Sequence, residues 1–407
     1  MSREFDFDPL DDPAFRADPH PILDRRRREC PVLRHAGRVF PVVSLFRYRD
    51  VKRVLLDHET FSMGQRPEEV ARGQTGDRGV EVSFIDPPEH TRIRSAYVNA
   101  LLPGAILDQR PFLVDQAALL VHKALERETI DLRRDVATPF AVAGIARLLG
   151  LPLEDAEIFT RWGRETSRND GAVLWLHKLE PERDARVARL MEEVEDYFSR
   201  WADGMGNARE LGWFGALVRT AEGGEAPISR KEALAVGAAI VLAGFDTVSA
   251  LICNTVRCLI ENPESDRAVR ADPAERLPAA ITESLRYRAP FTHGDRCVTR
   301  PVAIGSEKLE PGDTVISWFA SANRDEDVFE RPDVFDIDRS QRRFLAFGSG
   351  VHQCPGMSFA RLEVQIALEH LLQRTRSIEP AGEDWLSPSE APMIDAPEAV
   401  RVRLRAA

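Results

Sequence analysis

Cysteine is scarce and unpatterned in this sequence. The 407 residues include five cysteines: Cys30, Cys253, Cys258, Cys297 and Cys354. Because their number is odd and their spacing follows no repeating framework, a disulfide-stabilised fold is not expected, and a reducing cytoplasm fits. No CxxC or HxxxH pair lies near Cys354, which argues against a zinc site there.

A surplus of basic residues and a flexible linker are also missing. The net charge is −11, whereas a nucleic-acid-binding surface needs clustered lysine and arginine, so no nucleic-acid partner is expected. No Gly/Ser-rich or Pro-rich linker divides the chain, and 43% of its residues are apolar, enough for a large core. We expect one domain over residues 1–407, richer in strands at about 1–85, 289–320 and 385–405 and helical elsewhere.

Long apolar runs are nearly absent. The N-terminal stretch MSREFDFDPLDDPAF has neither the apolar core of a signal peptide nor a membrane anchor. The longest apolar run, from Ala233 to Phe245, ends at Asp246 and is shorter than the roughly 18 residues that a membrane span needs. We therefore expect this run to form a buried helix and the chain to have no membrane partner.

The most informative stretch is residues 347–356, FGSGVHQCPG. Gly348 and Gly350 allow a tight turn and a close approach to a flat partner, because glycine tolerates positive φ. Cys354 would lie at the start of a helix that begins near Met357, where unpaired amides and the helix dipole favour an anionic sulfur. A soft thiolate held in this way suits iron. A buried structural cysteine, a catalytic nucleophile and a zinc ligand are the alternatives.

A second unusual stretch, AGFDTV, lies inside a long helix predicted from Ser229 to Asn262. Ser229 and Glu232 form a capping-box pattern at its start. Gly244, Asp246 and Thr247 each disfavour an apolar helix, and such a concentration of unfavourable residues is typical of functional sites. The structural alternative is a threonine bonded to the carbonyl four residues earlier and an aspartate paired in a salt bridge.

Two charged pairs have spacings that are uninformative alone. His90 and Arg94 share a helix face at i, i+4, which is also the pattern of a solvated face. Glu283 and Arg286, at i, i+3 on a predicted helix, form the very common pattern ExxR.

Together these motifs resemble those of the cytochrome P450 family, soluble bacterial class. FGSGVHQCPG matches every fixed position of that family's cysteine-ligand loop, FGxGxHxCxG. The resemblance covers nearly the whole chain and implies a mainly α-helical fold with small β-sheets. It also implies a haem b (iron protoporphyrin IX) cofactor, with Cys354 as the iron ligand and Phe347, Gly348, His352 and Gly356 beside the haem.

The resemblance assigns roles to the other motifs. Asp246 and Thr247 resemble the family's acid–alcohol pair, which delivers protons and orients water or hydroperoxide, and Ala243 and Gly244 would open a groove for dioxygen. The remaining assignments are His90, Arg94 and Arg296 to the haem propionates, Glu283, Arg286 and Arg339 (in FDIDR) to a structural lock behind the cysteine loop, and Phe291, Thr292, neighbouring His293 and Trp175 to the substrate.

The expected function is a monooxygenase that inserts one atom of O2 into a C–H or C=C bond. Because no flavin or iron–sulfur segment is present, electrons would come from a separate ferredoxin or flavodoxin with its reductase, and Arg342, Arg343 and Arg361 offer it a basic patch or are simply a solvated face. We expect a cytoplasmic monomer acting on a small to mid-sized apolar molecule such as a terpenoid or polyketide, under lids at 62–82 and 170–181. The alternatives are a peroxygenase, isomerase or coupling enzyme of the same fold, or a haem sensor.

Overall fold

The computed structural model describes residues 12–38, 40–65, 82–169, 180–204, 212–340, 343–391 and 393–407. Most of both expected lids, Trp175 and Arg342 therefore lie outside the described residues. The helices are α1 (Pro13–Ala17), α2 (His20–Glu29), α3 (Tyr48–Leu56), α5 (Glu89–Tyr97), α6 (Pro103–Ile106), α7 (Arg110–Leu125), α8 (Thr138–Leu149), α9 (Ala156–Asn169), α10 (Pro181–Gly204), α11 (Gly212–Glu222), α12 (Arg230–Glu261), α13 (Pro263–Ala271), α14 (Pro273–Tyr287), α15 (Phe319–Ala322) and α16 (Met357–Arg374).

The strands form small sheets at the edges of this helical body. A five-stranded sheet has the order β1 (Val32–Arg34), β2 (Val42–Leu45), β8 (Thr314–Ser317), β5 (Gly294–Val298) and β3 (Phe61–Ser62), and a three-stranded sheet has the order β4 (Ile130–Asp131), β10 (Arg401–Ala406) and β9 (Thr375–Pro380). A hairpin joins β6 (Val302–Ile304) to β7 (Glu307–Leu309). The prediction of a mainly α-helical fold with small sheets is confirmed.

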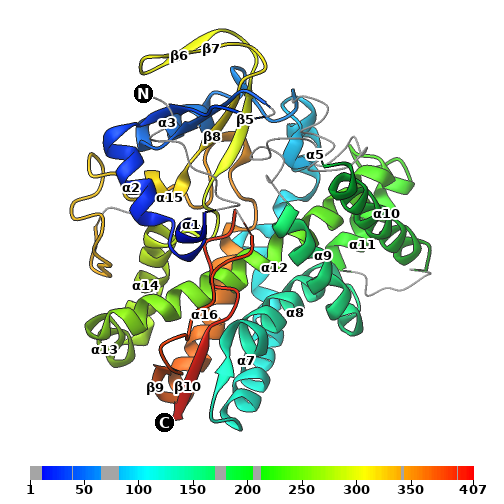
Figure 1. Ribbon diagram of the computed structural model, residues 1–407. Coiled ribbons are helices and arrows are strands. Elements are labelled where there is room, and N and C mark those ends of the chain that lie inside the picture. Colours follow the sequence, from blue (N-terminus) through cyan, green and yellow to red (C-terminus); the bar gives the residue numbers. More distant parts are fainter. Residues whose placement is uncertain are drawn as a thin grey trace.

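Helix α12 crosses the centre of the molecule, with α8, α9, α14 and α16 packed against it and the five-stranded sheet beyond one side (Figure 1). It begins at the predicted capping box: the Ser229 hydroxyl accepts from the Glu232 amide, and the Glu232 carboxylate accepts from the Ser229 amide. Among the described helices, α12 alone is long and apolar enough to span a membrane, but 72% of its most apolar window is buried within the protein. It is a core helix, as expected from the apolar run between Ala233 and Phe245.

Candidate active site

The cysteine loop turns tightly at both predicted glycines. Gly348 and Gly350 have φ values of 66° and 74°, in the region that favours glycine. A Cβ on Gly350 would lie 2.4 Å from the carbonyl oxygen of Leu55, at the end of α3, so the close approach is to protein backbone. The amide of Cys354 donates to the carbonyl of Phe347 at 2.9 Å, which closes the loop just before α16 begins.

The thiol of Cys354 belongs to a half-buried residue. Burial raises its pKa, and the backbone amides of Gly356 and Met357 together with the charge of Arg94 oppose that rise. Both amides belong to the start of α16, so the helix terminus faces the sulfur as the sequence predicted. Arg94 also donates to the carbonyl of Gln353 at 2.6 Å, which ties α5 to the loop.

A cluster of two imidazoles and two guanidinium groups lies beside the loop. The rings of His90 and His352 are 4.3 Å apart. His90 Nδ1 and His352 Nε2 are buried without a hydrogen-bond partner among the described residues, and the latter is 3.9 Å from Asp86 Oδ1. Burial and the neighbouring charges of His352 and Arg94 lower the pKa of His90 to about 4.

Arg296 joins this cluster from β5. It is 7% exposed, donates to the carbonyl of Asp295 at 2.6 Å, and acts electrostatically on His352, whose pKa is lowered mainly by burial. The structure thus brings His90, Arg94, Arg296 and His352 close to Cys354, although they come from α5, β5 and the cysteine loop.

The middle of α12 departs from its otherwise buried character. Ala243 is exposed and Gly244 and Thr247 are half-buried, although the helix is the central one. The Thr247 hydroxyl donates to the carbonyls of Ala243 at 3.1 Å and Gly244 at 3.3 Å. A Cβ on Gly244 would meet Ile145 of α8 at 2.7 Å, so this glycine also allows the two helices to pack closely.

Asp246 is buried and paired with an arginine that the sequence did not single out. Arg133 Nη2 donates to Asp246 Oδ1 at 2.6 Å, and both side chains are about 95% buried. The same guanidinium donates to the carbonyl of Pro397 at 2.7 Å and lies 3.8 Å from Glu398. The contacts of Asp246 and Thr247 are therefore those of the structural alternative: an aspartate in a salt bridge and a threonine bonded to the carbonyl four residues earlier. The Arg133–Asp246 ion pair also connects three segments that are distant in the chain.

Arg133 lies in the π-helical turn Arg133–Ala137, just before α8. Nothing local marks it, because Arg134 and Asp135 beside it are also charged but face outward, where they pair with each other at 2.9 Å. Which of two adjacent arginines turns inward depends on the fold, so no signal in the sequence identifies Arg133.

The three residues predicted to form a structural lock do meet. Arg286 Nη2 donates to Glu283 Oε1 at 2.6 Å, and Arg339 Nε donates to the same oxygen at 3.2 Å. Arg286 also donates to the carbonyl of Asn323, whose side-chain oxygen accepts from the amide of Leu345 at 2.6 Å. The network thus leads from α14 to the chain entering the cysteine loop.

The residues assigned to the substrate differ in how exposed they are. Phe291 is half-buried and paired in an antiparallel bridge with Ile394. The buried Thr292 hydroxyl contacts His293 Nδ1 at 2.8 Å and the carbonyl of Met393 at 3.2 Å. His293 is fully buried against Trp318, and burial lowers its pKa to about 4. Of these, Phe291 is the side chain with exposed surface, while His293 belongs to the core.

A buried glutamate was also missed. Glu363, on the inner face of α16, is fully buried, and neither carboxylate oxygen has a hydrogen-bond partner among the described residues. Burial raises its pKa well above the usual value. No group of three or more His, Cys, Asp or Glu side chains within the described part of the chain is arranged to hold a metal ion.

Comparison with known proteins gives consistent matches, and the matched relatives cover nearly the whole length. Residues 213–397 match the family model described as Cytochrome P450. The chain is 32% identical to the cyclomarin C epoxidase of Salinispora arenicola, covering 95% of this chain and 96% of that protein. It is 34% identical to the erythromycin C-12 hydroxylase of Saccharopolyspora erythraea, covering 90% of each.

Solved structures agree. A cytochrome P450 of Bacillus megaterium in complex with testosterone superposes with a TM-score of 0.85 and 28% sequence identity, covering 96% of this chain and 98% of that one.

Proposed function

Because the chain belongs to the cytochrome P450 family and is a monooxygenase like its relatives, we propose that it inserts one atom of O2 into a C–H or C=C bond of a small to mid-sized, mostly apolar natural product. The resemblance read from the sequence is thereby confirmed. The observation that carries the proposal is the half-buried thiol of Cys354, facing the amides that begin α16.

The family implies a haem, and the residues present fit one. A single thiol stands at a helix terminus, and two buried imidazole nitrogens, on His90 and His352, have no hydrogen-bond partner in the described structure. Two cations, Arg94 and Arg296, lie in the same cluster and suit the negative charge of carboxylates. In the proposal Cys354 would bind the iron of haem b, His90, Arg94 and Arg296 would bind its propionates, and the loop residues Phe347, Gly348, His352 and Gly356 would lie beside it.

Bound in this way, a thiolate-ligated haem supplies electron density that favours cleavage of the O–O bond. The protein's own contribution lies in α12. Ala243 and Gly244 leave surface open at the centre of the helix, where the Thr247 hydroxyl can turn from its own helix to orient water. Asp246, which Arg133 holds in place through a 2.6 Å contact, takes up protons and passes them on towards that hydroxyl.

The substrate and partners follow from the relatives and the sequence. An epoxidase and two macrolide-related enzymes among the relatives support a natural-product substrate, and Phe291 is the described side chain placed to touch it. Electrons come from a ferredoxin or flavodoxin with its reductase. The protein acts as a cytoplasmic monomer with one domain, consistent with the continuous core around α12.

The direct test compares the purified haem protein with its Cys354→Ser variant. Wild type, reduced and exposed to carbon monoxide, should show the strongly red-shifted absorbance band of a thiolate ligand, and the variant should lose it because a hydroxyl is a poor ligand for this iron. Cys297→Ser and Cys253→Ser, which remove two buried thiols, are the controls. Loss of the band in a control variant with retention in Cys354→Ser would refute the assignment.

A second experiment separates monooxygenase from the alternatives. Turnover of a panel of apolar natural products with O2, ferredoxin and reductase is compared with turnover by hydrogen peroxide alone and with no electron source. The proposal expects product in the first arm, peroxygenase activity would give it in the second, an isomerase in the third, and a haem sensor in none.

A further inference from the structure

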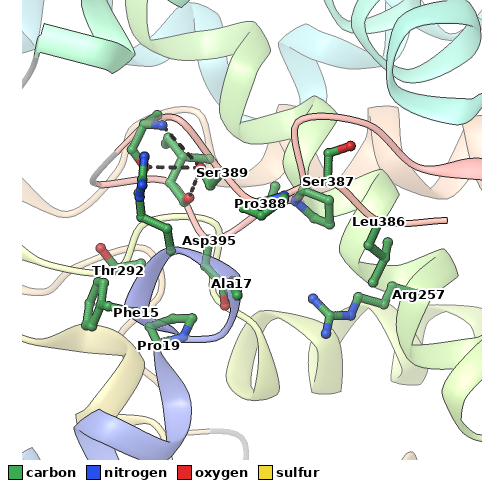
Figure 2. A pocket seen from close by; sticks show the side chains of 15 residues that line it. Phe15, Ala17, Pro19, Arg257, Thr292, Leu386, Ser387, Pro388, Ser389 and Asp395 are labelled. Atoms are coloured by element: carbon green, nitrogen blue, oxygen red, sulfur yellow. Dashed lines mark hydrogen bonds between the residues drawn. The ribbon is translucent and has the colours of Figure 1, made fainter. Parts of the chain in front are cut away.

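A second cavity lies away from the cysteine loop, between α1, the C-terminal half of α12 and the loop formed by residues 386–391 and 393–398, called the C-terminal loop below (Figure 2). Its volume is about 230 Å³. This is just below the usual range for pockets that take drug-sized ligands, so its occupant must be smaller than those. Most of its wall is apolar, including Phe15, Pro19, Leu386 and Ile394.

The wall of this cavity is held in place by hydrogen bonds within the C-terminal loop. The Ser389 hydroxyl donates to the carbonyl of Ile394 at 2.9 Å and accepts from the amide of Ala391 at 3.2 Å. The amide of Asp395 donates to the carbonyl of Pro290 at 2.9 Å. Because these hydrogen bonds hold the loop in place, the cavity is a preformed site rather than a gap between mobile segments.

Most polar groups on the wall already have partners. Asp395 accepts from His20 at 3.0 Å, and nearby arginines, Arg288 and Arg257, help to lower its pKa. Ser389 is used within the loop, and the Thr292 hydroxyl contacts Met393 and His293. Among the described wall residues, the arginine side chains still have donors to offer a ligand.

Two arginines supply those donors. Arg257 uses Nε to donate to Glu261 at 2.7 Å, and Figure 2 shows its terminal nitrogens directed into the space between Leu386 and Ala17. Arg16 lines the same cavity from α1, where it is exposed. The cavity is therefore a small, mostly apolar chamber with the hydrogen-bond donors of two arginines on its wall.

We propose that this cavity is a second ligand site, which binds a small amphipathic carboxylate with its acid group on Arg257 and its apolar part against Phe15, Leu386 and Ile394. Guanidinium groups bind carboxylates strongly because their donors match the two oxygens. Behind this wall, Ala250 of α12 packs with Ile394 and Ala396 and, with Phe291, forms an apolar layer. Thr292, which the sequence assigned to the substrate, also lines the cavity, so the test below must separate this site from the substrate site.

The test uses sodium octanoate and the ferric holoenzyme, titrated in a calorimeter while the haem absorbance is recorded in parallel. We expect one octanoate to bind without displacing the haem-bound water, so that heat is released with no change in the haem spectrum. In Arg257→Gln the affinity should fall about tenfold or more, the effect of losing one charged hydrogen bond. Octan-1-ol, which lacks the carboxylate, should bind weakly and equally to both proteins.

A matched control removes an equivalent i, i+4 ion pair elsewhere. Arg25 on α2 donates Nε to Glu29 at 2.9 Å, as Arg257 does to Glu261, but does not line the cavity. Arg25→Gln should leave octanoate binding unchanged. Ala17→Trp, at an exposed position on the wall, should block the cavity and carries the test if Arg257→Gln fails to bind haem.

Four results would overturn the site. They are no heat on addition of octanoate, equal affinity in wild type and Arg257→Gln, undiminished affinity in Ala17→Trp, and octanoate binding that appears wholly as a change in the haem spectrum. The last would place octanoate in the haem chamber.

Discussion

Pro355, the residue after Cys354, the proposed haem ligand, sets how many amides can donate to the sulfur. The amides of Gly356 and Met357 face Cys354, whereas a proline has no N–H to add. With one donor fewer than another residue would give, the thiolate keeps more of its charge, since partners around a metal ligand tune the metal. The haem should be harder to reduce as a result.

Pro355→Leu should therefore raise the reduction potential by tens of millivolts. A charge-assisted hydrogen bond contributes about 1.5 to 3 kcal/mol, and only a fraction falls differentially on the ferric state. Spectroelectrochemical titration of wild type and variant in one buffer measures the shift. Pro355→Ala restores the same N–H and should give the same sign. Equal potentials, or a lower one in both variants, would leave proline with the role of shaping the start of α16.

Thr247 and Asp246 are expected to contribute separately to oxygen activation. Thr247→Ala should leave haem and substrate binding intact but divert reducing equivalents to hydrogen peroxide, because no hydroxyl orients water at the open part of α12. Thr247→Ser keeps the hydroxyl and should stay largely coupled. The measurement is peroxide formed per NAD(P)H consumed in the reconstituted system.

Asp246→Asn removes the ionisable group while keeping its shape, so proton delivery and turnover should slow. Comparison of rates in H2O and D2O reports this step, because a slower proton transfer enlarges the solvent isotope effect. Full coupling in Thr247→Ala together with an unchanged rate in Asp246→Asn would remove the pair from the mechanism.

At the scale of elements, the contact between α16 and α8 depends on a glycine and a buried acid. A Cβ on Gly144 of α8 would come within 2.0 Å of Glu363 Oε1, so the carboxyl fills space that only glycine leaves. Burial without a partner raises the pKa of Glu363 and favours its neutral form. The unfolded chain, with a pKa of about 4.3, loses this proton first.

Between the unfolded and folded pKa values the native state binds more protons, so this residue makes the free energy of unfolding fall as pH rises, by about 1.4 kcal/mol per pH unit. Glu363→Gln, which cannot ionise, should become progressively more stable than wild type as the pH is raised above about 4.3. Denaturant unfolding at a series of pH values measures it, with Glu157→Gln, at an exposed glutamate, as the charge control. A stability difference that does not grow with pH would show that Glu363 ionises in place.

The sequence could predict those features that depend on residues close together in the chain. The capping box at Ser229, the turn glycines and the position of Cys354 before α16 are local patterns, and the structure has them. Arg133 and Glu363 were missed because their burial depends on contacts with residues more than 100 positions away, such as Asp246 and Gly144. The close packing of Gly244 on Ile145 was missed for the same reason.

For the whole molecule, the question is how an acidic protein would receive electrons from the proposed partner, a ferredoxin that is itself expected to be acidic. The net charge is −11, so long-range attraction must come from a local patch. Arg343 is exposed before the cysteine loop, whereas Arg361 is half-buried and lies 5.7 Å from the Phe347 ring centre. Arg343 is therefore the better placed of these two to meet a ferredoxin.

Arg343→Gln should slow reduction by ferredoxin severalfold at low ionic strength, because charges at the rim of an interface act mainly on the association rate. The difference should shrink at high salt, where such interactions are screened. Stopped-flow reduction under carbon monoxide measures the rate. Arg189→Gln, at an exposed arginine on α10, is the control. A rate that is independent of both salt and Arg343 would indicate docking through apolar contacts.

The guanidinium of Arg133 touches both Asp246 in α12 and the carbonyl of Pro397 in the C-terminal loop. The C-terminal loop and the proposed proton path are therefore mechanically joined, because any change of sequence that shifts this loop also shifts the arginine that holds Asp246. Substitutions in residues 393–398 should thus change the share of reducing equivalents lost as peroxide, even though none of these residues belongs to the acid–alcohol pair.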